Sequence, residues 1–228
     1  MTDIKWASEN GPIQVVNAAG LRGVQKPGHD HPRNPHTAAT EKIVADLAHA
    51  LKLPVPPVTL FDRGPAITQP PRYVAISAWA YDDVLTWGQA DPSVTEEQRA
   101  ALAVWASAML PFESWIAADD RHNPGNMLVG TAPDGTIVGA WIDYAFSLDL
   151  FWRGNLVEPC HVGKMYPPVA AQPDPAAMKE VAERISAMEN ATVEEIVNRV
   201  PAEYLPRASA DNIVRNLLAR RASVRALV

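Results

Sequence analysis

Residues 115–130, "WIAADDRHNPGNMLVG", place a strongly polar centre between apolar flanks. The centre holds two acids, an arginine, a histidine and two asparagines. A second apolar run, "AWIDYAFSL" at 140–148, is broken by one aspartate, Asp143. The pieces "NMLVG" and "GAWID" predict two short strands around the turn "APDG", which suits a hairpin. A strand leaving residue 126 and one returning to 143 are antiparallel neighbours, so we expect their polar ends to meet.

The bulk composition excludes several classes of protein. The 228 residues suffice for one domain with a large core or for two packed lobes. A net charge of -6 and a pI of about 5.5 argue against a protein that binds nucleic acid by neutralising phosphates. The lone cysteine, Cys160, has no partner for an internal disulfide. Without an apolar signal core or a run near the ~20 residues of a membrane span, we expect a cytoplasmic protein with no membrane insertion and no nucleic-acid partner.

The first part of the chain, residues 1–80, is predicted to be a small β-rich lobe. Strands are expected at 13–18 and 23–26, and again in "PPVTLFD" and "YVAISAWA". Between them, Thr37 is the expected N-cap of an amphipathic helix. The apolar stripe of that helix comprises Ile43, Val44, Leu47, Ala48 and Leu51.

The remainder, residues 81–228, is predicted to be a helical lobe that contains the hairpin. Its first helix is expected in "PSVTEEQRAALAVWASAMLPFESWIAA", where Thr95 and Gln98 are spaced as a capping box. Three further helical stretches follow residue 175, the second expected to be capped by Thr192. With a joint near 70–95, the order of elements indicates an α+β fold of two lobes.

The acids and amides of the hairpin region match the needs of phosphoryl transfer. Magnesium takes one or two carboxylates, amide oxygens and phosphate oxygens, and a further carboxylate must position the attacking hydroxyl. Asp120 is our candidate for orienting that hydroxyl or accepting its proton. Asn126 offers an amide oxygen to the metal, and Asp143 is the candidate for the main metal ligand.

The first lobe supplies the residues expected to bind ATP. Lys26 ends a predicted strand and Glu41 lies on the helix that follows, which is the arrangement of a kinase. The stretch "SENG", which contains Ser8 and Asn10, is a candidate loop over the phosphates. Trp79 lies where the lobes should join and where adenine should stack.

The sequence resembles the HipA-like kinases, bacterial relatives of the phosphatidylinositol 3/4-kinase superfamily. The resemblance rests on "AATEKIVADLAHALKLPVPPVTLFDR", on the two segments quoted first, and on the tail "NLLARRASVRALV". It covers nearly the whole chain in the right order. It implies a two-lobed protein-kinase-like fold with ATP and Mg²⁺ bound between the lobes. By motif match, it also implies that Lys26 contacts phosphate beside Glu41, that Asp120 is catalytic, and that Asn126 and Asp143 bind metal.

The chain departs from this family in its catalytic loop. The family places the asparagine five residues after the aspartate, whereas Asp120 and Asn126 are six apart. Either the loop bulges at Asn123, or Asn123 takes part of the role. His122 is expected to shape the loop or to contact phosphate. Tyr144 follows Asp143, in place of the Phe-Gly of ordinary protein kinases.

Simpler interpretations exist for each of these residues. Asp119 and Asp120 are also a common way to end a helix, and a lysine alone is usually a surface residue. His29, His31 and His36 have a spacing that suggests zinc, but a flexible polar loop is the better interpretation because no cysteine accompanies them.

Three functions follow from the sequence. The first is an ATP- and magnesium-dependent kinase that acts on a serine or threonine of an unidentified protein. The second is a catalytically silent kinase-like module that binds a nucleotide or a partner. The third is nucleotidyl transfer on the same fold.

Overall fold

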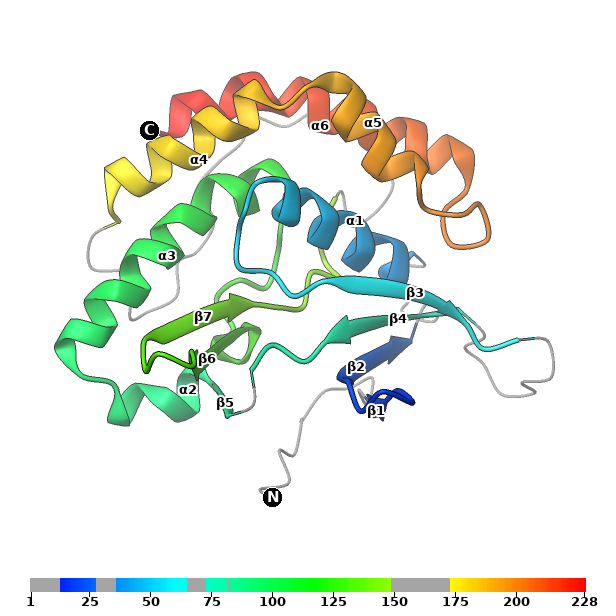
Figure 1. Ribbon diagram of the computed structural model, residues 1–228. Coiled ribbons are helices and arrows are strands. Elements are labelled where there is room, and N and C mark those ends of the chain that lie inside the picture. Colours follow the sequence, from blue (N-terminus) through cyan, green and yellow to red (C-terminus); the bar gives the residue numbers. More distant parts are fainter. Residues whose placement is uncertain (1–12, 28–35, 65–72, 82, 149–172) are drawn as a thin grey trace.

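The computed structural model of the chain describes residues 13–27, 36–64, 73–81, 83–148 and 173–228. Ser8, Asn10, His29, His31 and Cys160 therefore lie outside the described residues. The fold is α+β, as predicted: two small antiparallel sheets and a set of longer helices (Figure 1).

The first sheet has four strands in the order β1-β2-β4-β3. They are β1 (Ile13–Val16), β2 (Arg22–Pro27), β3 (Val58–Asp62) and β4 (Tyr73–Ala78). Helix α1 (Thr37–Ala50) follows β2 and packs on β3 and β4. The antiparallel register places Lys26 of β2 opposite Ala75 of β4, in the middle of the sheet.

The second sheet holds the predicted hairpin. Strands β6 (Met127–Thr131) and β7 (Ile137–Trp141) pair antiparallel, and β5 (Val84–Thr86) joins them in the order β5-β6-β7. Met127 pairs with Trp141, so the residues just outside the hairpin are brought together as expected. Between β5 and β6 the chain forms α2 (Trp87–Ala90), the 3-10 turn η1 (Asp91–Ser93), α3 (Glu96–Trp115) and the 3-10 turn η2 (Pro124–Asn126).

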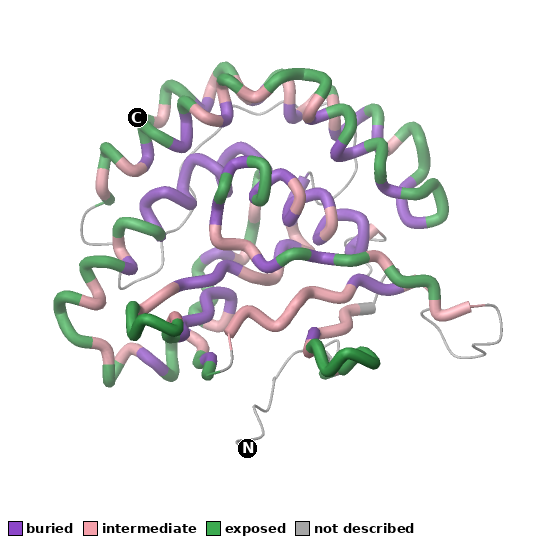
Figure 2. Tube along the Cα trace, viewed as in Figure 1, coloured by how far each residue is buried: buried purple, intermediate pink, exposed green. Residues whose placement is uncertain are grey.

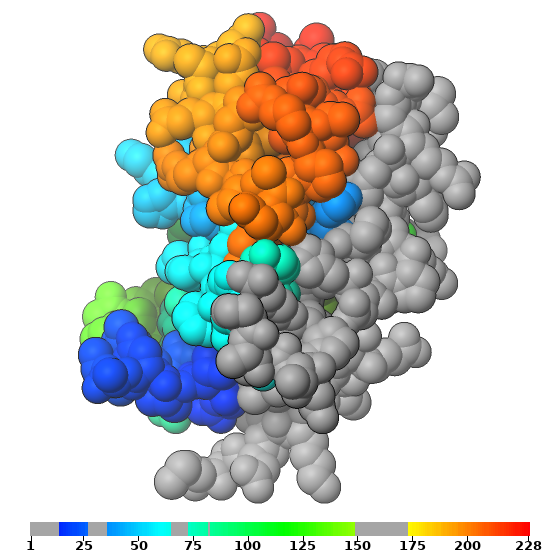
Figure 3. Space-filling model, turned by 90° about the vertical axis from the view of Figure 1, so that its right-hand side faces the viewer, coloured from blue at the N-terminus to red at the C-terminus, as the bar shows by residue number. Residues whose placement is uncertain are grey.

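The C-terminal helices form an arm that arches over α1 and α3 (Figure 1). They are α4 (Pro175–Ala187), α5 (Asn190–Asn198) and α6 (Arg207–Val224), followed by the 3-10 turn η3 (Arg225–Leu227). Seen from the side, the arm lies above the residues of α1 and β3, with the β1–β2 hairpin at the opposite end (Figure 3). Among the described residues, no helix is both long and apolar enough to cross a membrane.

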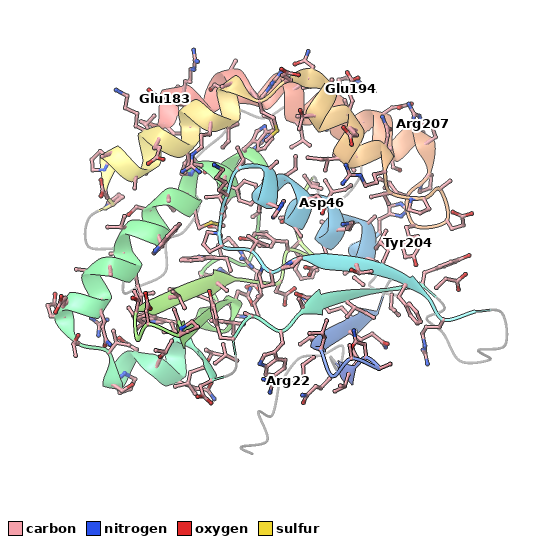
Figure 4. All side chains as sticks on the ribbon, in the orientation of Figure 1. Arg22, Asp46, Glu183, Glu194, Tyr204 and Arg207 are labelled. Atoms are coloured by element: carbon pink, nitrogen blue, oxygen red, sulfur yellow. The ribbon has the colours of Figure 1, made fainter. Side chains whose placement is uncertain are left out.

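Helix α1 is buried almost all round, because the sheet covers one side of it and the arm another (Figure 2). Its apolar stripe joins α3 and the arm in one continuous hydrophobic cluster. Polar contacts add to this packing: Arg184 of α4 donates to the backbone oxygen of Leu51, and Arg199, the C-cap residue of α5, lies 3.9 Å from Asp46. Asp46 lies on α1 beneath the arm (Figure 4). The helix that carries Glu41 is therefore held from several directions.

The predicted helix caps were right in one case of three. Thr95 accepts from the backbone of Gln98 and the Gln98 side chain accepts from that of Thr95, which is the expected capping box. Thr37, in contrast, is the buried first residue of α1, which begins after His36. Thr192 lies inside α5, which begins after Glu189. In both cases the helix starts earlier than predicted, by one residue at Thr37 and by three at Thr192, because packing of the apolar face outweighs a cap worth about 1 kcal/mol.

Gly130 of β6 is a point where the hairpin has no room for a side chain. A Cβ added there would lie 2.5 Å from the ring of Tyr81, whose hydroxyl donates to the backbone oxygen of Gly139 on β7. We expect Gly130→Ala to lower the free energy of unfolding by about 1–3 kcal/mol, the usual cost of overpacking. Urea unfolding measures this loss.

Gly88→Ala is the matched control, because its Cβ would meet Pro124 only at an ordinary 3.8 Å. That variant should be as stable as the wild type or slightly more so, since alanine favours the helix. Equal losses in the two variants would contradict the proposed clash with Tyr81.

Candidate active site

Lys26 is the point where three segments of the chain converge. Its ammonium nitrogen lies 2.6 Å from Glu41 Oε1 on α1 and 3.2 Å from Asp143 Oδ1, two residues beyond β7. The side chains of Lys26 and Glu41 are 18% and 5% exposed, whereas that of Asp143 is 43% exposed. The predicted lysine–glutamate pair is thus present, and Asp143 joins it from the other half of the chain.

The pKa values of this triad follow from its burial and its charges. For Lys26, burial disfavours the charged form, but Asp143 and Glu41 outweigh it and the pKa is raised. The pKa of Asp143 is lowered, mainly by the Lys26 charge. The pKa of Glu41 is raised because burial outweighs the attraction of Lys26 and Asp143 adds repulsion. An ionised aspartate at the exposed edge of the triad is suited to meet a cation.

The loop between α3 and β6 brings Asp120 and Asn126 together. The amide nitrogen of Asn126 donates to the backbone oxygen of Asp120 at 3.0 Å and lies 3.3 Å from its carboxylate Oδ2. Asn126 is buried, and its backbone oxygen accepts from the N–H of Ile142, next to Asp143. Asn123 is exposed and its side-chain oxygen accepts from the backbone of Gly125. The Asn123 side chain thus stabilises the turn that leads to Asn126.

Both aspartates of the site have an unusual backbone conformation. The φ angle is 58° at Asp120 and 63° at Asp143, in the left-handed region. Residues other than glycine rarely adopt this backbone conformation, and each instance costs on the order of 1–3 kcal/mol of folding free energy. Such conformations persist where surrounding contacts fix them, and they occur often in active sites.

The connector between the two sheets forms a small apolar cluster beside these polar groups. Trp79, Ala80 and Tyr81 pack there with four residues of the second sheet and its edge: Val84, Leu128, Ala140 and Ile142. The guanidinium of Arg22 lies 5.2 Å from the centre of the Trp79 ring. Arg22 lies on the side of the first sheet away from the C-terminal arm (Figure 4). Trp79 thus lies in the connector between β4 of the first sheet and β5 of the second.

Other predicted residues are more peripheral or lie outside the described structure. His122 is exposed, with Nε2 3.7 Å from Asp120 Oδ1. Ser8 and Asn10 are among the residues that the structure does not describe. Of the three histidines considered for zinc, only His36 is described, and it is the N-cap residue of α1.

Three further residues support the site but were missed in the sequence. Arg121 is 3% exposed, lies 3.6 Å from Glu113 of α3, and stacks 4.5 Å above the ring of Tyr144. The Tyr144 hydroxyl donates to Glu113 Oε1 at 3.4 Å. The sequence feature that could have indicated them is Glu113, a carboxylate inside the apolar run "AMLPFESWI". A buried acid needs a polar or charged partner, so its position predicts one nearby.

Asp143 and Asn126 are the residues whose oxygens could hold a magnesium ion that is shared with a phosphate. Since the Asn126 nitrogen is committed to Asp120, the amide oxygen is the atom left for a cation. Across the described segments, no group of three or more His, Cys, Asp or Glu residues is arranged to hold a metal alone. Proteins usually bind magnesium through one or two ligands of their own, and water and phosphate oxygens supply the remaining ligands.

The buried carboxyl group of Glu113 makes the free energy of unfolding depend on pH. Burial raises its pKa from 4.5 to about 7, although Arg121 and Tyr144 act in the opposite direction. A folded-state pKa above the unfolded one means that the folded state holds a proton that the unfolded state releases. Stability contributed by this group is therefore present below pH 4.5 and is lost as pH rises to about 7.

We expect Glu113→Gln to remove this loss, so the wild type should weaken relative to the variant by ~3 kcal/mol between those pH values. Urea unfolding at a series of pH values measures the difference. Glu183→Gln, at an exposed position of α4, should run parallel to the wild type. A pH-independent difference for Glu113→Gln would show that Glu113 is ionised throughout.

Comparison with known proteins agrees with the architecture. No protein-family model matches the chain, and no curated protein matches it either. Among solved structures, the chain is similar to that of a Helicobacter pylori proinflammatory kinase, CtkA. The TM-score is 0.66, and the match covers 95% of this chain and 92% of that one at 13% sequence identity. The similarity over nearly the whole length shows that the chain has a kinase-like fold.

Proposed function

We propose that the protein is an ATP- and magnesium-dependent phosphotransferase, and most specifically a HipA-like kinase of protein serine or threonine residues. The observation that carries this proposal is the position of Lys26 Nζ between Glu41 and Asp143. A phosphate-binding lysine held by a helix glutamate, beside a metal-binding aspartate, is what a kinase needs to orient ATP. The similarity to a solved kinase structure adds support at the level of the fold.

Each residue of the triad has a distinct role in this proposal. Lys26 leaves Asp143 to contact the phosphates of ATP, and Glu41 fixes the lysine side chain while it does so. Asp143 and the amide oxygen of Asn126 hold the metal. Bound Mg²⁺ would neutralise charge on the phosphate oxygens and orient them for transfer. The two carboxylates differ in exposure, and this difference suits their roles. Glu41 is buried, whereas Asp143 is partly exposed and can be reached by a metal ion.

Asp120 acts on the acceptor. Its carboxylate orients the attacking hydroxyl and accepts its proton as the oxygen–phosphorus bond forms and ADP leaves. Asn126 donates to both the backbone and the carboxylate of Asp120, which fixes this group beside the metal ligands. His122 assists Asp120 in this role, because its Nε2 lies 3.7 Å from Asp120 Oδ1.

The adenine base occupies the connector. The backbone groups of Ala80 form no hydrogen bond within the part of the chain that the structure describes, and they adjoin the apolar cluster of Leu128 and Ile142. A planar base with a polar edge fits such a place, with Trp79 beside it. Residues 1–80 would then be the lobe on one side of the nucleotide, and residues 81–228 the lobe on the other.

The chemistry is tested by incubating the protein with Mg-ATP and candidate acceptors and measuring intact mass. We expect an increase of about 80 Da for each phosphate transferred. An increase of about 329 Da, the mass of an added AMP, would assign nucleotidyl transfer instead. Binding of Mg-ATP without any change in mass of the protein or its acceptors would leave the silent module as the function.

The ligand assignment is tested by thermal unfolding with ATP in the presence and absence of magnesium. A ligand that binds only the folded state adds about 2.7 kcal/mol at 100 times its dissociation constant. Asp143→Asn should abolish the magnesium-dependent part of this stabilisation. Asn126→Ala should weaken the apparent affinity for magnesium, and excess magnesium should partly restore it.

Asn123→Ala is the control that decides the register of the loop. Its side chain serves a turn, so its loss should leave the magnesium dependence nearly unchanged. A magnesium-dependent defect in Asn123→Ala but not in Asn126→Ala would move the metal ligand to Asn123.

A further inference from the structure

Arg121 connects the two loops of the site in a way that the proposed chemistry does not use. One of its nitrogens, Nη2, donates to the backbone oxygens of Ile142 at 2.9 Å and of Asp143 at 2.6 Å. Its Nε donates to the backbone oxygen of Asp119 at 3.3 Å. A single side chain thus joins the loop before β6 to the loop after β7.

The two carbonyl groups that Arg121 holds lie on either side of the Asp143 Cα atom: one belongs to Ile142 and the other to Asp143 itself. The oxygen of Ile142 belongs to the peptide plane whose rotation sets φ of Asp143, and the oxygen of Asp143 belongs to the plane that sets ψ. Fixing both planes fixes both torsions. The φ of 63° is unfavourable for aspartate, so without such contacts the backbone would relax to a more common conformation.

Stability alone does not account for Arg121. Its ion pair with Glu113 is buried, at 3% and 8% side-chain exposure, and the charged atoms are 3.6 Å apart. Taking two charges out of water at this separation gains little or nothing over apolar residues of the same size. The Tyr144 ring and Glu113 instead hold the guanidinium in place.

We propose that Arg121 is a positioning residue that sets the backbone torsions of Asp143, and through them the geometry of the metal ligand. This inference rests on the proposed function, in which Asp143 binds magnesium. The chain offers a matched control in Arg220 of α6. Arg220 is also buried, and it donates to two successive backbone oxygens, those of Ser114 and Trp115, at the end of α3.

The test uses calorimetry of a non-hydrolysable ATP analogue, with magnesium or with a chelator, so that no turnover is needed. The variant is Arg121→Met combined with Glu113→Gln, which removes the carbonyl contacts without leaving a buried charge unpaired. Loss of partners that orient metal ligands typically costs about 10- to 100-fold in metal affinity. We expect the ratio of the dissociation constants without and with magnesium to fall by about that factor. The affinity measured with chelator should stay nearly unchanged.

Arg220→Met should lose stability and yet keep the wild-type ratio. A wild-type ratio in the folded double variant would overturn the inference, as would an equal fall in Arg220→Met. Failure of the double variant to fold, where Arg220→Met folds, would assign Arg121 to stability and overturn it too. A wild-type protein that binds the analogue equally with and without magnesium would instead refute the proposed function, and the inference with it.

Discussion

The contact of Lys26 with both Glu41 and Asp143 is the constraint on which the rest of the structure depends. A lysine that is 18% exposed keeps its charge only because two carboxylates face it. Those carboxylates come from α1 and from the loop after β7, so the triad forms only when both sheets are assembled. The site is therefore complete only when both halves of the chain are folded.

The C-terminal arm contributes to this constraint at a distance. Glu41 contacts Lys26 only if α1 is packed at a fixed distance from the first sheet. Because α1 is apolar on more than one face, it must be buried against more than one neighbouring element. The arm supplies this cover, and it adds Arg184 at the end of α1 and Arg199 beside Asp46. A helix enclosed in this way has little freedom to move Glu41 away from the lysine.

The sequence was informative where a feature depends on neighbouring residues. Alternation and turn residues were enough to predict the β6–β7 hairpin, and the strand–helix order was enough to pair Lys26 with Glu41. The starts of α1 and α5 were not predictable from Thr37 and Thr192, because a cap contributes less free energy than the burial of a helix face. Nor did any local pattern indicate Arg121, whose partners at 113 and at 142–144 are joined only by the fold.

The backbone strain at the two aspartates explains why so much polar structure is buried around them. An aspartate at the end of a regular strand would continue in the direction of that strand, whereas the left-handed conformation at Asp143 turns the chain sharply just beyond β7. The same conformation at Asp120 turns the chain before Asn126. Each turn needs fixed carbonyl groups, and Arg121 and Asn126 supply the donors. The buried arginine, its glutamate and the buried asparagine are thus consequences of holding two aspartates in two strained loops.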